Sequence, residues 1–334
     1  MSVTDAPRVT APPFVPHRWL ENGHVMTIYA WARARQFPSL PAPEARLIRV
    51  SPDTQVLTHC YWQVERSRRP TLIALHGLEG SSEAHYMRGL ADKAWRRGWN
   101  AVLVNQRNCG GTEQLTPGLY HSGLTEDPRR VMRALAADEG LRSFGLVGYS
   151  LGGNVTMKLA GELADHPDLP VRAAVAVSPT IDLERCVRAI ERRVNVAYEW
   201  NFVRHLKARM RRKAEFWPKA FDLTKLDGIR TIRAFDEIYT APHHGFAGAT
   251  DYYHRASAIR VTDRIRIPAL ILTAEDDPFV PAAQFEDPAV AGNAWIARRV
   301  EHDGGHCGFV CAPNSDDGYW AETRAVEFLA SAFM

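Results

Sequence analysis

The feature that most constrains the fold is an apolar run that ends in a Gly-X-Ser-X-Gly turn. Residues 144–153 read Phe-Gly-Leu-Val-Gly-Tyr-Ser-Leu-Gly-Gly, and the helix-compatible stretch 154–160 follows at once. A serine between a buried strand and a helix stands on a tight turn, and glycines two positions before and after it relieve crowding by side chains. The following helix directs N–H groups and its positive dipole end toward developing negative charge. The pattern therefore predicts that Ser150 is an exposed nucleophile for acyl transfer.

Size and charge narrow the class of protein. A chain of 334 residues, 46% of them hydrophobic, can form one large α/β domain with an insertion, or two modest domains. Because 41 Lys and Arg nearly balance 38 Asp and Glu, the net charge of +3 does not indicate a nucleic-acid partner. The basic segment 204–213 is typical of a solvated helix face, with contact to a membrane surface or an anionic substrate as the alternative.

The cysteines and the N-terminus indicate a reducing compartment. Five scattered cysteines form no disulfide framework, so we expect a cytoplasmic protein. Cys307 and Cys311 lie near His302 and His306, but no Cys-X-X-Cys pair supports a metal site, and we predict neither metal nor cofactor. No export signal and no apolar segment of about 18 residues is visible. We therefore expect no transmembrane segment, while peripheral membrane contact stays open.

Apolar runs and helical patterns alternate along most of the chain. Residues 1–43, rich in proline and aromatic side chains, are expected to form an arm packed on a domain that spans 44–334. The expected strands are 45–50, 56–64, 71–75, 101–104, 144–147, 173–177, 269–273 and 295–300. Helical patterns lie at 85–97, 128–138, 154–164 and 319–333. This alternation predicts an α/β fold with a mostly parallel eight-stranded sheet, helices on both faces and an antiparallel edge made by the first two strands.

The interval of about 180–267 is too long for one crossover, so we interpret it as a helical cap insertion. It contains an aromatic and basic helical stretch, 194–218, and an expected loop rich in Gly, His and Tyr, 239–253. An insertion here lies above the carboxyl ends of the strands, where open α/β sheets place their sites. The aromatic side chains expected to line an acyl pocket include Trp200, Phe202, Phe216 and Trp217.

A serine nucleophile needs a base and an orienting carboxylate, which in this architecture follow in the order serine, acid, histidine. Only His302 and His306, of the 13 histidines, follow the acid turn 274–281. We choose His306, because it stands in a glycine-flanked loop, whereas His302 directly abuts the eighth strand.

Either Asp276 or Asp277 can supply the acid at this turn. We prefer Asp277, which directly precedes a proline and lies three residues before Val280. Asp276 is expected to point the other way and brace the loop.

Two backbone amides are needed to stabilise the oxyanion of a tetrahedral intermediate. Leu151, the residue after the nucleophile, supplies one. The turn Leu75-His76-Gly77-Leu78-Glu79-Gly80 follows the third expected strand, and the Leu78 amide is the second candidate. We interpret His76 as a hydrogen-bonded part of the scaffold rather than a catalytic group.

With these residues placed, the chain resembles the α/β-hydrolase superfamily, and specifically the YheT-like bacterial hydrolases and their eukaryotic abhydrolase-domain relatives that act on lipid esters. The matching segments are Phe14 with 19–24, 76–82, 86–90, 105–112, 120–123, 245–246 with 251–253, 276–278 and 304–309. Asn108 departs from the family, which usually has glycine there, but asparagine tolerates a left-handed backbone and we expect the loop shape to be retained. The eukaryotic relatives commonly carry an N-terminal membrane anchor, which we do not expect here, so the resemblance implies ester hydrolysis more strongly than a membrane-lipid substrate.

The sequence thus predicts a serine hydrolase that cleaves carboxylic esters through an acyl-enzyme, with no cofactor. Ser150 is the nucleophile, His306 the general acid and base, and Asp277 fixes the imidazole tautomer. The aromatic insertion favours a small-molecule ester or lipid-like substrate with an apolar acyl group. One alternative is an acyltransferase on the same scaffold, which product analysis with an added alcohol would separate. The other is a non-catalytic ligand-binding protein, which a fluorophosphonate label would test.

Overall fold

One eight-stranded sheet runs through the computed structural model, which describes residues 12–312 and 317–333. The strands are β1 (Glu44–Ser51), β2 (Thr54–Tyr61), β3 (Thr71–Leu75), β4 (Asn100–Val104), β5 (Phe144–Tyr149), β6 (Val171–Val177), β7 (Ala269–Ala274) and β8 (Ile296–Glu301). Their order is β1-β2-β4-β3-β5-β6-β7-β8. β2 pairs antiparallel with both β1 and β4, and the other neighbours pair in parallel. The predicted mostly parallel sheet with an antiparallel edge is confirmed.

Burial explains why these segments form strands. Every residue of β3, β5 and β7 is buried, as expected for central parallel strands covered on both faces, which read as continuous apolar runs. β1 lies at the sheet edge, and there Ile48 and Val50 are buried while Leu47 is exposed. The central strands therefore form a rigid frame whose carboxyl ends meet at one edge.

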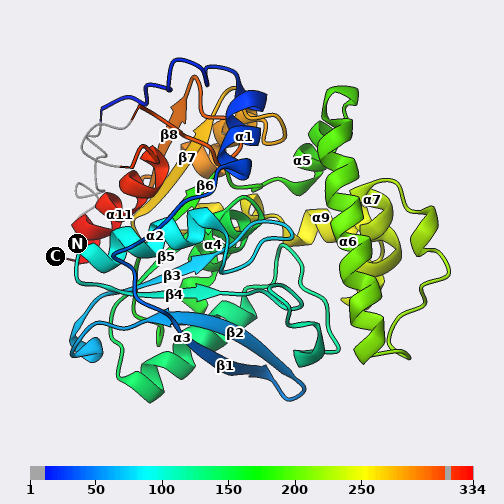
Figure 1. The fold of residues 1–334 in the computed structure, drawn as a ribbon, viewed down its shortest axis with the longest axis horizontal. Helices are drawn as coiled ribbons and strands as arrows, with labels where there is room; N and C mark the ends of the chain where they lie inside the picture. Colours follow the sequence, from blue (N-terminus) through cyan, green and yellow to red (C-terminus); the bar gives the residue numbers. More distant parts are fainter. Residues whose placement is uncertain (1–11, 313–316, 334) are drawn as a thin grey trace.

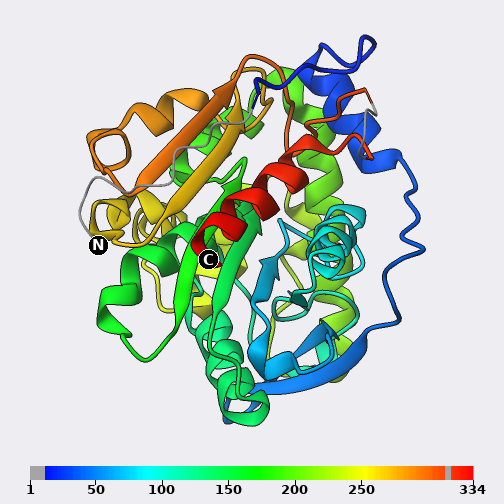
Figure 2. The ribbon, with the colours of Figure 1, turned by 90° about the vertical axis from the view of Figure 1, so that its left-hand side faces the viewer.

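Helices cover both faces of the sheet (Figure 1). They are α1 (Gly23–Ala32), α2 (His85–Arg96), α3 (Glu126–Glu139), α4 (Leu151–Glu162), α5 (Leu183–Ile190), α6 (Val196–Phe216), α7 (Ile232–Phe235), α8 (Ala241–His243), α9 (Ala249–Ala256), α10 (Pro288–Ala291) and α11 (Trp320–Phe333). α3, α4 and α10 contribute to one apolar core, and α1, α2 and α11 to another. Figure 2 shows the red α11 lying across one face of the sheet. In the described part of the chain, none of these helices combines the length and the apolar character needed to cross a membrane.

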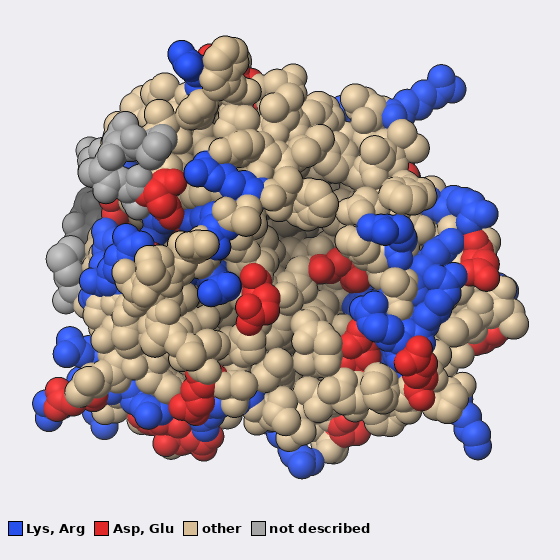
Figure 3. Space-filling view, viewed as in Figure 1, with Lys and Arg blue, Asp and Glu red and all other residues tan. Residues whose placement is uncertain are grey.

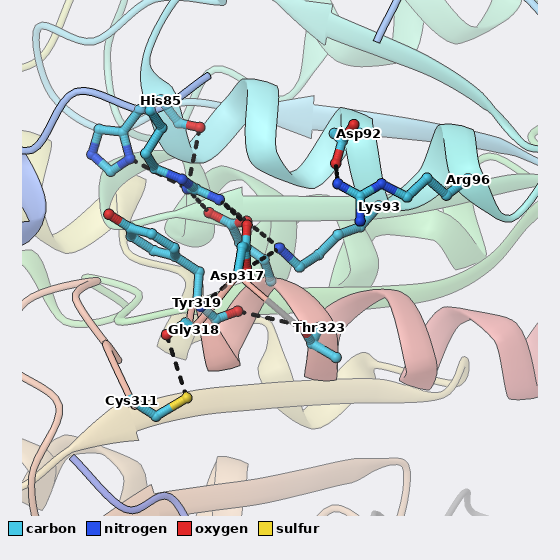
Figure 4. A network of polar contacts seen from close by, with 11 residues as sticks. His85, Asp92, Lys93, Arg96, Cys311, Asp317, Gly318, Tyr319 and Thr323 are labelled. Carbon is cyan, nitrogen blue, oxygen red and sulfur yellow. Dashed lines mark hydrogen bonds and ion pairs between the residues drawn. The ribbon is translucent and has the colours of Figure 1, made fainter. Parts of the chain in front are cut away.

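A buried ionic network fixes the segment before β1 to the domain. The Arg35 guanidinium pairs with Glu322 on α11 and with Asp317, at 2.6 Å between Nη2 and Oδ2. Lys93 on α2 reaches Asp317 Oδ1 at 2.7 Å, and Figure 4 shows the two side chains pointing toward each other between α2 and α11. Removing one partner would leave an uncompensated buried charge. These contacts join the end of the segment before β1 to α2 and α11, and residues 1–11 of the expected arm 1–43 lie outside the described residues.

The insertion between β6 and β7 is helical and lies to the right of the sheet in Figure 1. It comprises α5 to α9 and has its own apolar cluster, to which Ile190, Leu206 and Phe235 belong. The expectation of a loop at 239–253 is wrong, because α8 lies within this stretch and α9 begins in it. Glu237 Oε2 accepts the first N–H of α9 at 2.7 Å, from Ala249. That contact joins residues 12 positions apart, so composition alone did not indicate it.

Candidate active site

Ser150 occupies a strained position between β5 and α4. Its backbone has φ 53° and ψ −116°, a conformation that L-residues rarely adopt. A Cβ at Gly148 would lie 2.1 Å from the carbonyl oxygen of Gly152, and one at Gly152 would lie 2.3 Å from that of Leu75. Only glycine fits at these two positions, so the sequence pattern and the tight turn have the same steric cause.

The structure brings Ser150, His306 and Asp277 together in one hydrogen-bonded chain. Ser150 Oγ lies 2.9 Å from His306 Nε2, and His306 Nδ1 lies 2.9 Å from Asp277 Oδ2. The second carboxylate oxygen, Asp277 Oδ1, accepts N–H groups from Phe279 and Val280, both at 3.0 Å. In the neutral ring, the carboxylate accepts the proton on Nδ1, so the lone pair of Nε2 faces the serine hydroxyl.

Charge around His306 favours its protonated form. Burial lowers the pKa of the imidazole, but the Asp277 carboxylate and, after it, the Cys307 thiol group outweigh this effect and raise the pKa above its ordinary value. The Asp277 side chain is itself fully buried. An imidazolium at this position is therefore stabilised by the neighbouring carboxylate.

Three successive backbone N–H groups hold the loop that carries His306. Gly305 donates to Asp276 Oδ1 at 2.8 Å, His306 donates to Thr27 Oγ1 at 2.8 Å, and Cys307 donates to Ser178 Oγ at 3.1 Å. Asp276 thus braces the loop, while its neighbour Asp277 faces the imidazole. Thr27 and Ser178 were not identified from the sequence, because no local motif marks them and Thr27 lies 279 residues from His306.

Two histidines considered from the sequence lie elsewhere. The His302 side chain is 85% exposed and contacts Asp303, away from Ser150. His76 is buried, with Nδ1 2.8 Å from the carbonyl oxygen of Gly77 and Nε2 accepting the N–H of Gln106 at 3.1 Å. Burial lowers the pKa of His76 to about 4, so its ring stays neutral and supports the turn after β3.

In the turn after β3, the N–H group of Leu78 lies between two N–H groups that are already hydrogen-bonded, those of Gly77 and Glu79. The Gly77 N–H donates to the Tyr86 hydroxyl at 3.1 Å, and the Glu79 N–H donates to the Tyr120 hydroxyl at 3.0 Å. Among the described residues, neither the Leu78 N–H nor the Leu151 N–H has a hydrogen-bond acceptor. Leu78 and Leu151 line the same cavity as Ser150. These two donors are therefore available to a negatively charged oxygen beside the serine.

Comparison with known proteins agrees with this arrangement. Residues 70–313 match the protein family described as the alpha/beta hydrolase fold. The chain belongs to the α/β-hydrolase family. It is 35% identical over 320 residues to the putative esterase YheT of Escherichia coli (strain K12), which covers 95% of this chain and 93% of that protein. The resemblance to YheT-like hydrolases found in the sequence is confirmed.

A further relative and a solved structure share different features with this α/β hydrolase. A monoacylglycerol lipase of Saccharomyces cerevisiae is 30% identical over 250 residues, which is 72% of this chain and 55% of the lipase. The solved structure of the Pyrococcus furiosus esterase Pf2001 aligns with a TM-score of 0.60 over 97% of this chain and 99% of that one, at 16% identity. This structural likeness shows the shared fold alone.

A cavity extends from Ser150 and His306 under the helical insertion of this α/β hydrolase. It encloses about 800 Å³, including its open mouth, and is lined largely by apolar side chains. Phe202 and Leu206 contribute from α6 and Phe235 from α7. The ring of Phe279 lies 4.3 Å from that of His306, centroid to centroid. This apolar lining is typical of a pocket for a small apolar ligand.

The expectation about the aromatic lining was correct only for Phe202. Trp200 and Phe216 are exposed, and Trp217 donates its indole N–H to the Glu113 carbonyl at 3.0 Å. The helical period explains the difference, because positions 202, 206 and 209 share one face of α6 and position 200 lies on the opposite face. Positions 216 and 217 fall at the end of the helix, beyond the cavity.

Two charged side chains at the cavity wall, Arg209 and Asp236, have polar partners. Arg209 pairs with Glu79 at 2.9 Å, and its guanidinium lies 4.6 Å from the ring centre of Tyr120. Asp236 accepts the Tyr253 hydroxyl at 2.7 Å, and burial raises the pKa of Asp236 to about 6. Glu79 therefore balances the charge of Arg209, whereas Asp236 receives a hydrogen bond from a neutral hydroxyl group. Within the described residues, no group of three or more His, Cys, Asp and Glu side chains could hold a metal ion.

Proposed function

We propose that this protein hydrolyses carboxylic esters through a covalent acyl-enzyme. Ser150 is the nucleophile, His306 the general base and acid, and Asp277 holds the imidazole in its working tautomer. The observation that carries the proposal is the continuous chain from Ser150 Oγ through the imidazole to Asp277 Oδ2, with both contacts at 2.9 Å.

The proposed reaction has two halves that use the same groups. Ser150 Oγ attacks the ester carbonyl carbon while its proton moves to His306 Nε2, and the N–H groups of Leu78 and Leu151 stabilise the oxyanion. As the C–O bond breaks, His306 returns the proton to the leaving alcohol. Water then attacks the acyl-enzyme by the same route and releases the carboxylic acid. In each half, His306 takes one proton and gives it back, so the enzyme returns to its starting state without any further group.

The substrate proposed is a small or lipid-like ester with an apolar acyl group. The cavity that begins at Ser150 is lined by side chains such as Phe202, Leu206 and Phe235 and would remove an acyl chain from water. The names of the relatives, an esterase and a monoacylglycerol lipase, support the same class of substrate.

A fluorophosphonate probe and p-nitrophenyl butyrate test the proposal together. The parent protein should bind the probe covalently and hydrolyse the ester, and Ser150→Ala should abolish labelling and lower kcat by about 10⁴- to 10⁶-fold. Ser331→Ala, a matched change at an exposed position on α11, should leave both unchanged. Full activity in folded Ser150→Ala protein would overturn the proposal.

A further inference from the structure

The outer face of α1 is apolar and exposed. Trp31 is 70% exposed, Ile28 53% and Val25 48%, and Trp19 just before the helix is 70% exposed. Monomeric soluble proteins rarely expose contiguous apolar surface of this kind unless it contacts something.

A second exposed apolar group lies at the start of α6. Val194 and Val196 are exposed, and Trp200 is 63% exposed on the face of α6 that points away from the cavity. His24 and Tyr198 join the two helices, with stacked rings 5.7 Å apart and 3.3 Å between Nδ1 and the hydroxyl oxygen. Figures 1 and 2 place α1 and the first turns of α6 at the same upper end of the molecule. We call this region the apolar end surface, made of Trp19, Val25, Ile28, Trp31, Val194, Val196 and Trp200.

Arginines border this surface. The Arg18 guanidinium lies 4.8 Å from the ring centre of Trp19, and that of Arg204 lies 5.3 Å from Trp200. Arg33 ends α1, and Arg192 and Arg193 precede Val194. Figure 3 shows mostly tan surface over α1 and the top of α6, with blue side chains toward its edges.

The acidic residues of the same two stretches, 18–33 and 191–204, offset few of these charges. They are Glu21, Glu191 and Glu199. Glu191 is paired with Arg233 at 2.9 Å, and Glu199 is buried. The border is therefore basic, and the aromatic rings with arginines beside them match the side chains that proteins place at the boundary between lipid headgroups and acyl chains.

The helices that expose this surface also form the site. The inner face of α1 carries Thr27, which holds His306, and the inner face of α6 carries Phe202 and Leu206, which line the cavity. A helix with its side chains is about 10 Å thick, so the apolar end surface lies about one helix from the reacting groups.

We propose that the apolar end surface docks the protein on an anionic phospholipid bilayer, with the Trp and Ile side chains among the acyl chains and the arginines at the headgroups. Charge complementarity selects this partner over a second copy of the chain, because a two-fold interface would set the basic border against itself. Docking itself does not depend on hydrolysis. Only the delivery of a lipid-like ester to Ser150 rests on the proposed function.

Vesicle binding tests the inference directly. The full chain should co-sediment with vesicles of phosphatidylglycerol and phosphatidylcholine, bind less to phosphatidylcholine alone, and dissociate as salt screens the arginines. Trp31→Gln should weaken binding about tenfold, as should Trp200→Gln, because each removes one large apolar side chain from the bilayer. Both variants should hydrolyse soluble p-nitrophenyl acetate at the parental rate.

Two control variants separate docking by this surface from a general loss of apolar surface and from loss of hydrolysis. Leu47→Ser changes an exposed apolar side chain on β1, remote from α1, and should bind vesicles as the parent does. Ser150→Ala should also bind normally, so a failure of the proposed hydrolysis would not disturb this result. Absence of binding to anionic vesicles, or equal losses for Trp31→Gln and Leu47→Ser, would overturn the inference. A parental dimer that Trp31→Gln dissociates in analytical ultracentrifugation would also overturn it, since the surface would then be a subunit interface.

Discussion

The carboxyl edge of the sheet and the helical insertion above it hold their side chains in different ways. At the edge, Asp277 and His306 are fixed by hydrogen bonds in which both carboxylate oxygens and both ring nitrogens take part. In the insertion, Phe202 and Leu206 are held by apolar packing on one face of α6. Hydrogen bonds are directional and packing is not, so the edge fixes the chemistry while the insertion determines which ligands fit. Changes at the edge should therefore affect rate, and changes in the insertion should affect substrate preference.

The largest difference in rate should appear between substitutions at two adjacent aspartates, Asp276 and Asp277. Asp277→Asn should lower kcat about 10⁴-fold, because the amide no longer fixes the tautomer of His306. Asp276→Asn should be mild, since Asp276 accepts an N–H from Gly305 and does not face the imidazole. Steady-state kinetics with a nitrophenyl ester measures both. A greater loss in Asp276→Asn would reverse our assignment of the acid.

The pH dependence of activity should reveal the effect of Asp277 on the pKa of His306. Only neutral imidazole can take the serine proton, and Asp277 raises the pKa of His306, so activity should rise with pH through a midpoint above about 6.5. Removing the negative charge of Asp277 should lower that pKa. The ring can be titrated by ¹⁵N NMR in Ser150→Ala protein with and without Asp277→Asn. Equal midpoints in the two proteins would show that Asp277 does not control the charge of His306.

The hydroxyl of Thr27 should matter less, because it positions His306 without touching a reacting atom. Thr27→Val leaves the buried His306 N–H without its acceptor, at a cost of about 1–3 kcal/mol, and should lower kcat about tenfold with KM unchanged. Thr27→Ser keeps the hydroxyl and should restore the rate. A matching loss in Thr27→Ser would mean that the methyl group in the core, and not the hydrogen bond, is what counts.

The smallest effect on rate should come from the cavity wall. Phe202→Ala should shift the preference among acyl lengths by about 3- to 10-fold toward longer chains, because a longer chain can fill the vacated space. Phe216→Ala, the same change at an exposed position of the same helix, should leave the preference unaltered. A series of nitrophenyl esters from acetate to decanoate gives the comparison. If both variants behave alike, the wall of the cavity does not select the acyl group.

Local sequence patterns could predict much of the site. Gly148 and Gly152 reveal the turn at Ser150 because steric exclusion acts between neighbouring backbone atoms. The order of strands likewise indicated that an acid after β7 and a histidine after β8 would meet the serine, and the structure brings Asp277 and His306 to Ser150. These three residues could therefore be chosen from the sequence, because their chemical types and their positions after the strands are both visible there.

Other features depended on contacts between distant segments. Thr27 reaches His306, and Glu237 caps α9 inside a stretch whose Gly, His and Tyr content indicated a loop. Whether Trp200 or Phe202 meets the cavity depends on which face of α6 packs downward, and both residues are large and aromatic. The sequence by itself determined the fold class and the groups that we propose for acyl transfer, because strand pattern and turn sterics are local. Only the tertiary structure decided which side chains brace the site and which face water, because packing between remote helices has no signature in either segment alone.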